Sequence, residues 1–200
     1  MPKGHLVGLI GKHGVGKLSI AKYLQDHRGW CMQYNDKYIH QALSRLFMLP
    51  ENIFLNENTR DTVFPPSNWT PRQIQHRIEL MLQKEFKDFD IHHIRLAAFE
   101  DEVVHNLQKG INVVIPDVYT LHQQDMIVRN GGLLVEVVEH HTATTYNTPY
   151  TNQYYDYVLV RCEMSRDEIE VLASTLHDNI LLRKHIQHHM PSCVTIAYHT

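Results

Sequence analysis

The residues that most clearly could do chemistry are seven consecutive positions that match the phosphate-loop pattern GxxxxGK: Gly11, Lys12, His13, Gly14, Val15, Gly16 and Lys17. They follow an apolar segment and precede an amphipathic one, which is the context that this motif requires. Glycines let the backbone turn tightly and point successive N–H groups inward, and a following helix adds the positive end of its dipole. Lys17 supplies a positive charge for the β- and γ-phosphates of a nucleotide. The alternative interpretation is a glycine-rich turn that binds nothing.

The hydroxyl that often follows the lysine of a phosphate loop is displaced by one position, because Leu18 stands there and Ser19 comes next. Leucine cannot hold Mg²⁺, so we expect Ser19 to lie beside the phosphates and the metal. This displaced hydroxyl resembles the loops of adenylate-kinase-like enzymes and favours a small-molecule kinase over a GTPase or a motor ATPase. Asp117, at the end of an apolar segment, is the candidate acidic partner of Mg²⁺. The alternatives are a solvent-facing serine and a turn-forming aspartate.

The elements that must position these residues follow from the hydrophobic pattern. Apolar segments at 5–10, 30–34, 111–115 and 133–138, with one inside 154–161, indicate strands, and they alternate with amphipathic helices. Three capping boxes begin helices at Thr70, Thr120 and Ser165, and residues 51–69 are expected to be irregular. Continuous apolar strands that alternate with helices predict an α/β P-loop NTPase fold, with a five-stranded parallel sheet covered on both faces. We expect a single domain over 1–200, with a helical nucleoside-monophosphate-binding insert at 35–110 and a lid-like loop at 139–154.

Composition limits the classes of function. The formal net charge is −3, from 19 Lys and Arg against 22 Asp and Glu, so no general attraction to nucleic acid is expected. No apolar run approaches the length of a membrane span. Three widely spaced cysteines, Cys31, Cys162 and Cys193, fit reduced thiols, and we expect a cytoplasmic protein (in the host cytoplasm if viral). The 16 histidines include three adjacent pairs without metal-ligand spacing, so we interpret them as incidental.

With these residues in place, the chain resembles the phage deoxynucleoside-monophosphate kinases. The phosphate loop 11–19 corresponds to that family's first motif, and the segment 39–43 corresponds to its IKxAL helix. Thr70-Pro71-Arg72 corresponds to a helix start with Thr or Ser, Pro and Arg. The segments 113–119 and 131–139 correspond to the VVxDxR strand end and the GGxxIxVxR strand. The order and spacing agree over about residues 5–160, and their joint order carries the resemblance more than any one motif.

The resemblance implies an NMP-kinase-like fold, ATP with Mg²⁺ as cofactors, a deoxynucleoside monophosphate as acceptor, and often a homodimer. Lys17 and Ser19 carry over as triphosphate ligands, Asp117 as the metal-side carboxylate, and Arg72 as a residue of the acceptor pocket.

Three positions depart from the family pattern: His40 replaces a lysine, and Tyr119 and Glu139 replace arginines. Phosphoryl transfer depends on positioning and positive charge, so such losses weaken catalysis unless other arginines compensate. Arg45 and Arg60 lie where nucleotide kinases grip the acceptor phosphate, and an arginine fork suits that role. We therefore expect the acceptor to be bound by these residues: Arg45, Arg60, Arg72, Arg77 and His40. The alternative for Arg45 and Arg60 is that each is a surface arginine with no ligand.

The expected reaction transfers the γ-phosphoryl group of ATP to a (deoxy)nucleoside monophosphate, giving ADP and the diphosphate. One alternative is a degenerate P-loop protein that binds a nucleotide as a sensor, inhibitor or subunit with little turnover. Another is a P-loop kinase with a different small-molecule acceptor. A nucleic-acid ATPase is disfavoured by the net charge and by Leu18 after the lysine.

Overall fold

A computed structural model describes residues 4–65, 67–86, 91–139, 157–161, 165–183 and 194–196. The chain divides into two compact units, one formed by Met1–Tyr34 with Glu100–Thr200 and the other by Asn35–Phe99. The predicted lid-like loop at 139–154 lies outside the described residues, except for the backbone of Glu139, and the histidine pairs at 140–141 and 188–189 also lie outside them.

The first unit is built on one parallel sheet with the strand order β2-β3-β1-β4-β5-β6. All five predicted strands are present: β1 (Leu6–Ile10), β2 (Cys31–Met32), β3 (Val113–Ile115), β4 (Leu133–Glu139) and β5 (Tyr157–Arg161). The predicted number of five was nevertheless wrong, because a sixth strand, β6 (Val194–Ile196), pairs with β5. A strand of three residues is too short to produce a recognisable alternation in the sequence.

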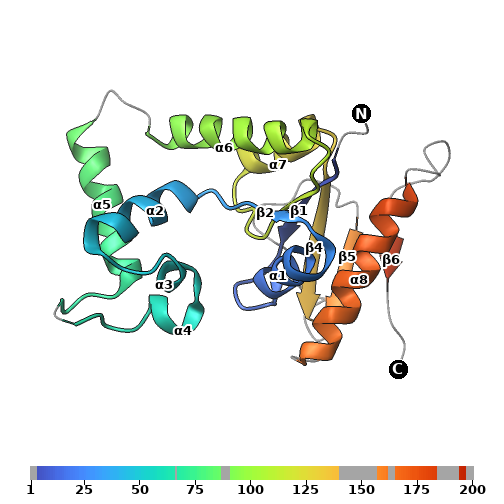
Figure 1. Ribbon diagram of the computed structural model, residues 1–200, viewed down its shortest axis with the longest axis horizontal. Helices are drawn as coiled ribbons and strands as arrows, with labels where there is room; N and C mark the ends of the chain where they lie inside the picture. The colour runs from blue at the N-terminus through green and yellow to red at the C-terminus, as the bar shows by residue number, and fades with distance from the viewer. Residues whose placement is uncertain are drawn as a thin grey trace. The chain divides into compact units, whose positions relative to one another are not determined.

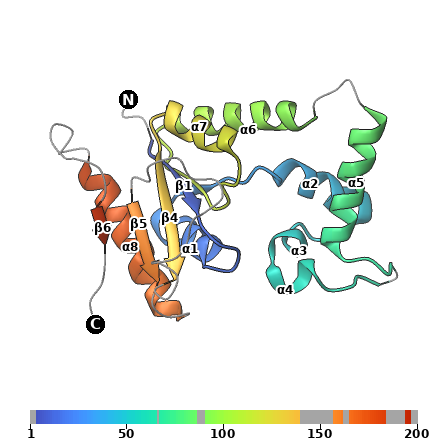
Figure 2. The same cartoon turned by 180° about the vertical axis from the view of Figure 1, so that it is seen from behind.

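Helices cover both faces of this sheet. In Figure 1, α1 (Lys17–Arg28) and α8 (Arg166–Arg183) lie on the near face, and they pack with β1 and β4 in one apolar core. Seen from behind in Figure 2, the strands lie in front of these two helices. On the other face α7 (Leu121–Arg129) packs against β1 and β4. All five residues of β1 are buried, as expected for a strand enclosed between two helical layers.

The second unit is helical and contains α2 (Lys37–Phe47), α3 (Asn52–Leu55), α4 (Glu57–Arg60) and α5 (Pro71–Glu85). Its own core consists of Leu43, Leu49 and Phe54. The prediction that 51–69 is irregular was wrong in part, because α3 and α4 lie there. Each has only four residues, which is too few for a 3.6-residue period to be seen. The helix α6 (Ile91–Gln108) begins in this unit and continues into the first.

Two predicted helix starts are confirmed in full. The side chains of Thr70 and Thr120 each accept a hydrogen bond from the backbone N–H three residues later. In turn, the side-chain oxygens of Gln73 and Gln123 accept a hydrogen bond from the backbone N–H of the cap residue. Within the described ranges, no helix combines the length and apolar character that crossing a membrane would take.

Candidate nucleotide-binding site

The loop between β1 and α1 turns through three glycines with positive φ: Gly11 at 144°, Gly14 at 81° and Gly16 at 99°. Side chains are strained at such angles. At Gly11 there is also no room, because a Cβ atom would lie 2.3 Å from the carbonyl oxygen of Val137 on β4. The tight path from a buried strand into a helix start therefore depends on residue type, and it directs the loop backbone toward the carboxyl edge of the sheet.

The start of α1 has no side-chain cap. Its N-cap is Gly16, which cannot supply one, whereas α5 and α7 are closed by the complete capping boxes of Thr70 and Thr120. The first four N–H groups of a helix have no partner inside the helix. At α1 the missing cap and the helix dipole together produce a site that suits an anion.

The ammonium group of Lys17 lies inside this loop. Lys17 is only 4% exposed, and its Nζ donates to the carbonyl oxygens of Gly11 at 2.8 Å and Lys12 at 2.7 Å. The same Nζ atom lies 3.8 Å from Oδ1 of Asp117. A buried ammonium is costly unless hydrogen bonds and opposite charge surround it, and here the loop and Asp117 supply both.

Strand pairing brings Asp117 to this place. Because β3 pairs in parallel with β1, the end of β3 lies beside the loop that follows β1. The N–H of Val118 donates to the carbonyl oxygen of Leu9 at 3.2 Å and fixes the chain just after Asp117. The Asp117 side chain remains 40% exposed, so its carboxylate is paired with Lys17 and also open to solvent.

The oxygen ligands available here fit Mg²⁺. Ser19 is exposed on the first turn of α1, and Asp117 offers a carboxylate. Mg²⁺ prefers hard oxygen ligands and is commonly held by one or two protein groups together with substrate phosphates and water. Among the described residues, no group of three or more His, Cys, Asp or Glu could hold a metal. The pair Ser19 and Asp117 thus fits a metal that arrives with a nucleotide.

Tyr119, at a position where the family pattern has an arginine, lies beside the phosphate loop. Its ring centroid is 6.0 Å from Nζ of Lys17, and the residue is 50% exposed. Its backbone N–H donates to Oε1 of Gln123 at 2.8 Å, so the cap of α7 also positions this residue. The sequence indicated only the loss of an arginine at Tyr119, whereas the structure places an aromatic ring near Lys17.

The five predicted acceptor residues lie in the second unit. Arg45 is exposed on α2. Arg72 forms an ion pair with Asp61 at 2.7 Å, and Arg60 lies 3.8 Å from the same carboxylate. The structure therefore brings Arg60 and Arg72 together around Asp61. Arg77 instead lies over the indole ring of Trp69, with its guanidinium carbon 3.3 Å from the ring centroid.

His40 is buried and belongs to a polar network. Its Nε2 lies 3.0 Å from Oε1 of Gln75, and its ring stacks on Phe54 with centroids 5.3 Å apart. Burial lowers the pKa of His40, although the hydrogen bond to Gln75 opposes this. A neutral, buried His40 is suited to positioning α2 against α5.

Arg95 extends this network and is not among the residues predicted for the acceptor site. It donates to Asp36 at 2.6 Å and to Glu79 at 3.1 Å, and Gln75 bonds to both carboxylates. These residues lie on three different helices or at their starts. No local sequence signal connects them, because the contacts depend on tertiary packing.

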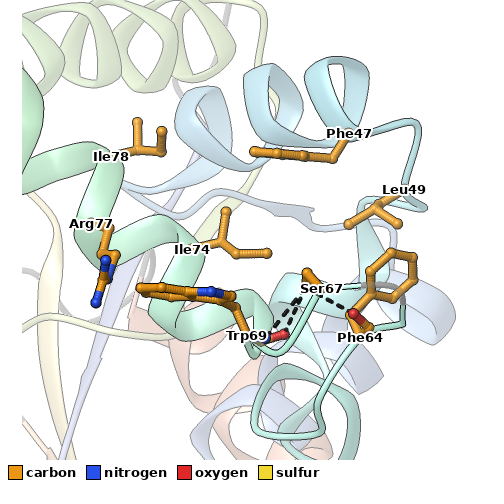
Figure 3. Close-up of a pocket in the computed structure, with 8 residues that line it drawn as sticks. All are labelled: Phe47, Leu49, Phe64, Ser67, Trp69, Ile74, Arg77 and Ile78. Atoms are coloured by element: carbon orange, nitrogen blue, oxygen red, sulfur yellow. Dashed lines mark hydrogen bonds between the residues drawn. The ribbon is translucent and has the colours of Figure 1, made fainter.

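A pocket of about 400 Å³ lies within the second unit (Figure 3). It is lined by aromatic and aliphatic side chains with one serine and one arginine: Phe47, Leu49, Phe64, Ser67, Trp69, Ile74, Arg77 and Ile78. Of the residues predicted for the acceptor site, Arg77 is the one that lines it.

Comparison with known proteins gives a partial similarity. No family model matches the chain. A protein of Acanthamoeba polyphaga mimivirus named "Putative deoxynucleotide monophosphate kinase" is 29% identical over 145 residues, covering 66% of this chain and 72% of that protein. Two solved structures are similar at low sequence identity. The APS kinase of Mycobacterium tuberculosis in complex with AMPPNP and APS is 14% identical, covering 90% of this chain and 99% of that one, with a TM-score of 0.45. Shikimate kinase of Acinetobacter baumannii in complex with shikimate is 12% identical, covering 92% and 96%, with a TM-score of 0.44.

Proposed function

We propose that this protein transfers the γ-phosphoryl group of ATP to a (deoxy)nucleoside monophosphate, giving ADP and the corresponding diphosphate. The observation that carries the proposal is the surroundings of Lys17. Its buried ammonium lies inside a glycine turn, at the uncapped start of α1, 3.8 Å from the carboxylate of Asp117. The name of the mimivirus relative supports the same class of reaction.

The chain's own groups suit a triphosphate. Backbone N–H groups of the loop and of the first turn of α1 would donate to the phosphate oxygens, and Lys17 would exchange its two carbonyl contacts for contacts to the β- and γ-phosphates. Ser19 and Asp117 would hold Mg²⁺, which neutralises charge on the phosphates when it is bound. An anionic phosphate oxygen attacks without prior deprotonation, so positioning and charge neutralisation carry the catalysis.

The acceptor side of the proposal rests on the second unit. Arg45, Arg60 and Arg72 would provide guanidinium groups for a monophosphate, Arg77 would contact another part of the acceptor, and His40 positions α2. Asp61 lies between Arg60 and Arg72 in this structure, so an acceptor phosphate would compete with it for Arg72.

The test is a coupled assay of ADP release with ATP, Mg²⁺ and each of the four common deoxynucleoside monophosphates. We expect ADP release that requires both the acceptor and Mg²⁺. Arg72→Gln should raise the KM for the acceptor with little change in the KM for ATP. The matched control is Arg129→Gln, an exposed arginine on α7 that is paired with Glu100 and should behave as wild type. A rate of ADP release that is the same with and without the acceptor would contradict the proposal.

A second candidate is a nucleotide-binding protein with little turnover. It is favoured by Tyr119, which places a ring beside Lys17 where a cation would stabilise the transferred group, and by the pairing of Arg72 with Asp61. The same assay separates the two functions. Tight ATP binding without acceptor-dependent ADP release would select this second candidate.

A further inference from the structure

The pocket of the second unit has the form of a slot between two aromatic rings. Figure 3 shows Phe47 of α2 and Trp69 on opposite sides of the space. Ile74 and Ile78 project into it from α5, and Leu49 and Phe64 line the other side. A volume of about 400 Å³ falls in the range of small-ligand sites. Aromatic side chains on two sides suit a flat ring, which can stack on them.

The polar groups of this pocket are few, and they differ in availability. Ser67 is already engaged, because its Oγ donates to the carbonyl oxygen of Phe64 at 2.8 Å and accepts from the N–H of Trp69. Arg77 lies over Trp69, with its guanidinium carbon 3.3 Å from the ring centroid, and among the described residues no hydrogen bond or ion pair engages its guanidinium. The lining side chains therefore offer N–H donors to a ligand and no carboxylate or amide acceptor.

This combination discriminates between ligands. A polyhydroxy acceptor would lose its hydration against apolar walls without replacement. A heteroaromatic ring with carbonyl oxygens could stack on the rings and accept from Arg77. The exocyclic amino group of cytosine or adenine would bring two N–H donors that find no acceptor among the lining side chains, whereas thymine would bring only one, its N3–H, and each unpaired donor in such a site is costly. Thymine presents carbonyl oxygens and a methyl group, whereas cytosine and adenine present amino groups at the corresponding edge.

We propose that this slot binds the base of the acceptor nucleotide and prefers bases with carbonyl oxygens, thymine above the others. The inference rests on the proposed function, because it takes a nucleotide as the acceptor. It goes further by assigning the base to the space between Phe47 and Trp69 and by assigning its carbonyl oxygens to Arg77.

The first experiment measures equilibrium binding of dTMP, dUMP, dCMP and dAMP to the wild-type protein without ATP, by calorimetry and by tryptophan fluorescence. The chain has two tryptophans, and Trp30 is buried in the core of the first unit, so a change on binding reports Trp69. We expect dTMP to bind most tightly and dUMP roughly fourfold more weakly, for the loss of one buried methyl group. dCMP and dAMP should bind about tenfold or more weakly. Binding of dCMP or dAMP equal to that of dTMP, or no binding of dTMP, would overturn the inference.

The second experiment uses matched variants. Phe47→Ala removes one wall of the slot and should weaken dTMP binding about tenfold or more. Leu46→Ala removes the adjacent side chain, which is 67% exposed and does not line the pocket, and should leave binding unchanged. Arg77→Met should reduce the preference for dTMP over dCMP. Equal effects of the two alanine variants on dTMP binding would overturn the assignment.

These results separate this inference from the proposed function. Selective dTMP binding that depends on Phe47, without phosphoryl transfer, would support the base site and contradict the kinase activity. Phosphoryl transfer to nucleotides with a KM for the acceptor that is unchanged in Phe47→Ala and Arg77→Met would support the kinase activity and overturn the base site.

Discussion

The Nζ atom of Lys17 lies 3.8 Å from Oδ1 of Asp117, although the two residues belong to different elements of the sheet edge. Lys17 begins α1, and Asp117 follows β3, which pairs with β1. The parallel pairing of β1 and β3 therefore brings together the cation that we propose binds phosphate and the carboxylate that we propose binds the metal.

Asp117→Asn should reduce Mg²⁺-dependent ADP release by roughly 10-fold or more, because the amide keeps the shape of the side chain and loses its charge. Binding of ATP in the absence of Mg²⁺ should persist, since Lys17 and the loop remain. The measurement is a titration of activity against Mg²⁺ concentration. Asp125→Asn, an exposed change on α7, serves as the control. An unchanged Mg²⁺ dependence for Asp117→Asn would contradict the assigned role.

Gly11→Ala and Gly14→Ala should differ in their effects on stability. At Gly14, where φ is 81°, a Cβ would meet no atom within 4 Å, so the cost is backbone strain of about 1 kcal/mol. At Gly11, where φ is 144°, the Cβ would also meet the carbonyl oxygen of Val137 at 2.3 Å, so the loop or β4 must shift. In urea unfolding, Gly11→Ala should lower the free energy of unfolding more than Gly14→Ala does, by at least about 1 kcal/mol. Equal losses would show that the loop does not approach β4 as described.

Stability should depend on pH through His177. The indole N–H of Trp30 donates to Nδ1 of His177 at 3.0 Å, which requires that this nitrogen be unprotonated. Burial lowers the pKa of His177 below the ordinary histidine value of 6.5; Arg28 lowers the pKa further, and Asp178 raises it. His177 therefore binds a proton more readily in the unfolded chain than in the folded one. The stability that neutral His177 contributes is fully present above pH 6.5 and is lost as pH falls toward the pKa of His177 in the folded state.

The measurement for His177 is the urea midpoint at about pH 7.5 and about pH 5.5, on either side of the ordinary histidine pKa. The wild-type midpoint should fall on acidification. The urea midpoint of His177→Gln, whose amide oxygen can still accept from Trp30, should fall less over the same pH interval. His122→Gln, an exposed histidine on α7, should retain the wild-type dependence. A parallel fall in wild type and His177→Gln would contradict this role for His177.

Local signals in the sequence predicted much of the first unit. The spacing of Gly11, Gly16 and Lys17 after an apolar strand located the phosphate loop, because a strand, a tight turn and a helix start each leave a local signature. The capping boxes at Thr70 and Thr120 fixed two helix starts for the same reason. The proximity of Asp117 to Lys17 followed from the rule that ligands meet the carboxyl ends of parallel strands.

The second unit was less accessible to such reasoning. The four-residue helices α3 and α4 are shorter than the period by which helices are recognised. The stacking of Arg77 on Trp69 and the bonds of Arg95 to Asp36 and Glu79 join residues from separate segments, so only the folded chain shows them. The arginines proposed for the acceptor could be named from the sequence, but their partners Asp61 and Trp69 could not.

The most direct test is the thermal or urea stability of wild type and Lys17→Ala with and without Mg²⁺ and ATP. A ligand at 100 times its Kd stabilises a protein by about 2.7 kcal/mol, and we expect wild type to gain a stabilisation of this order. Lys17→Ala should remain folded and gain almost none, while Lys22→Ala, an exposed change on the same helix, should match wild type. If Lys17→Ala is stabilised by ATP as much as wild type, the loop at 11–17 does not hold the triphosphate.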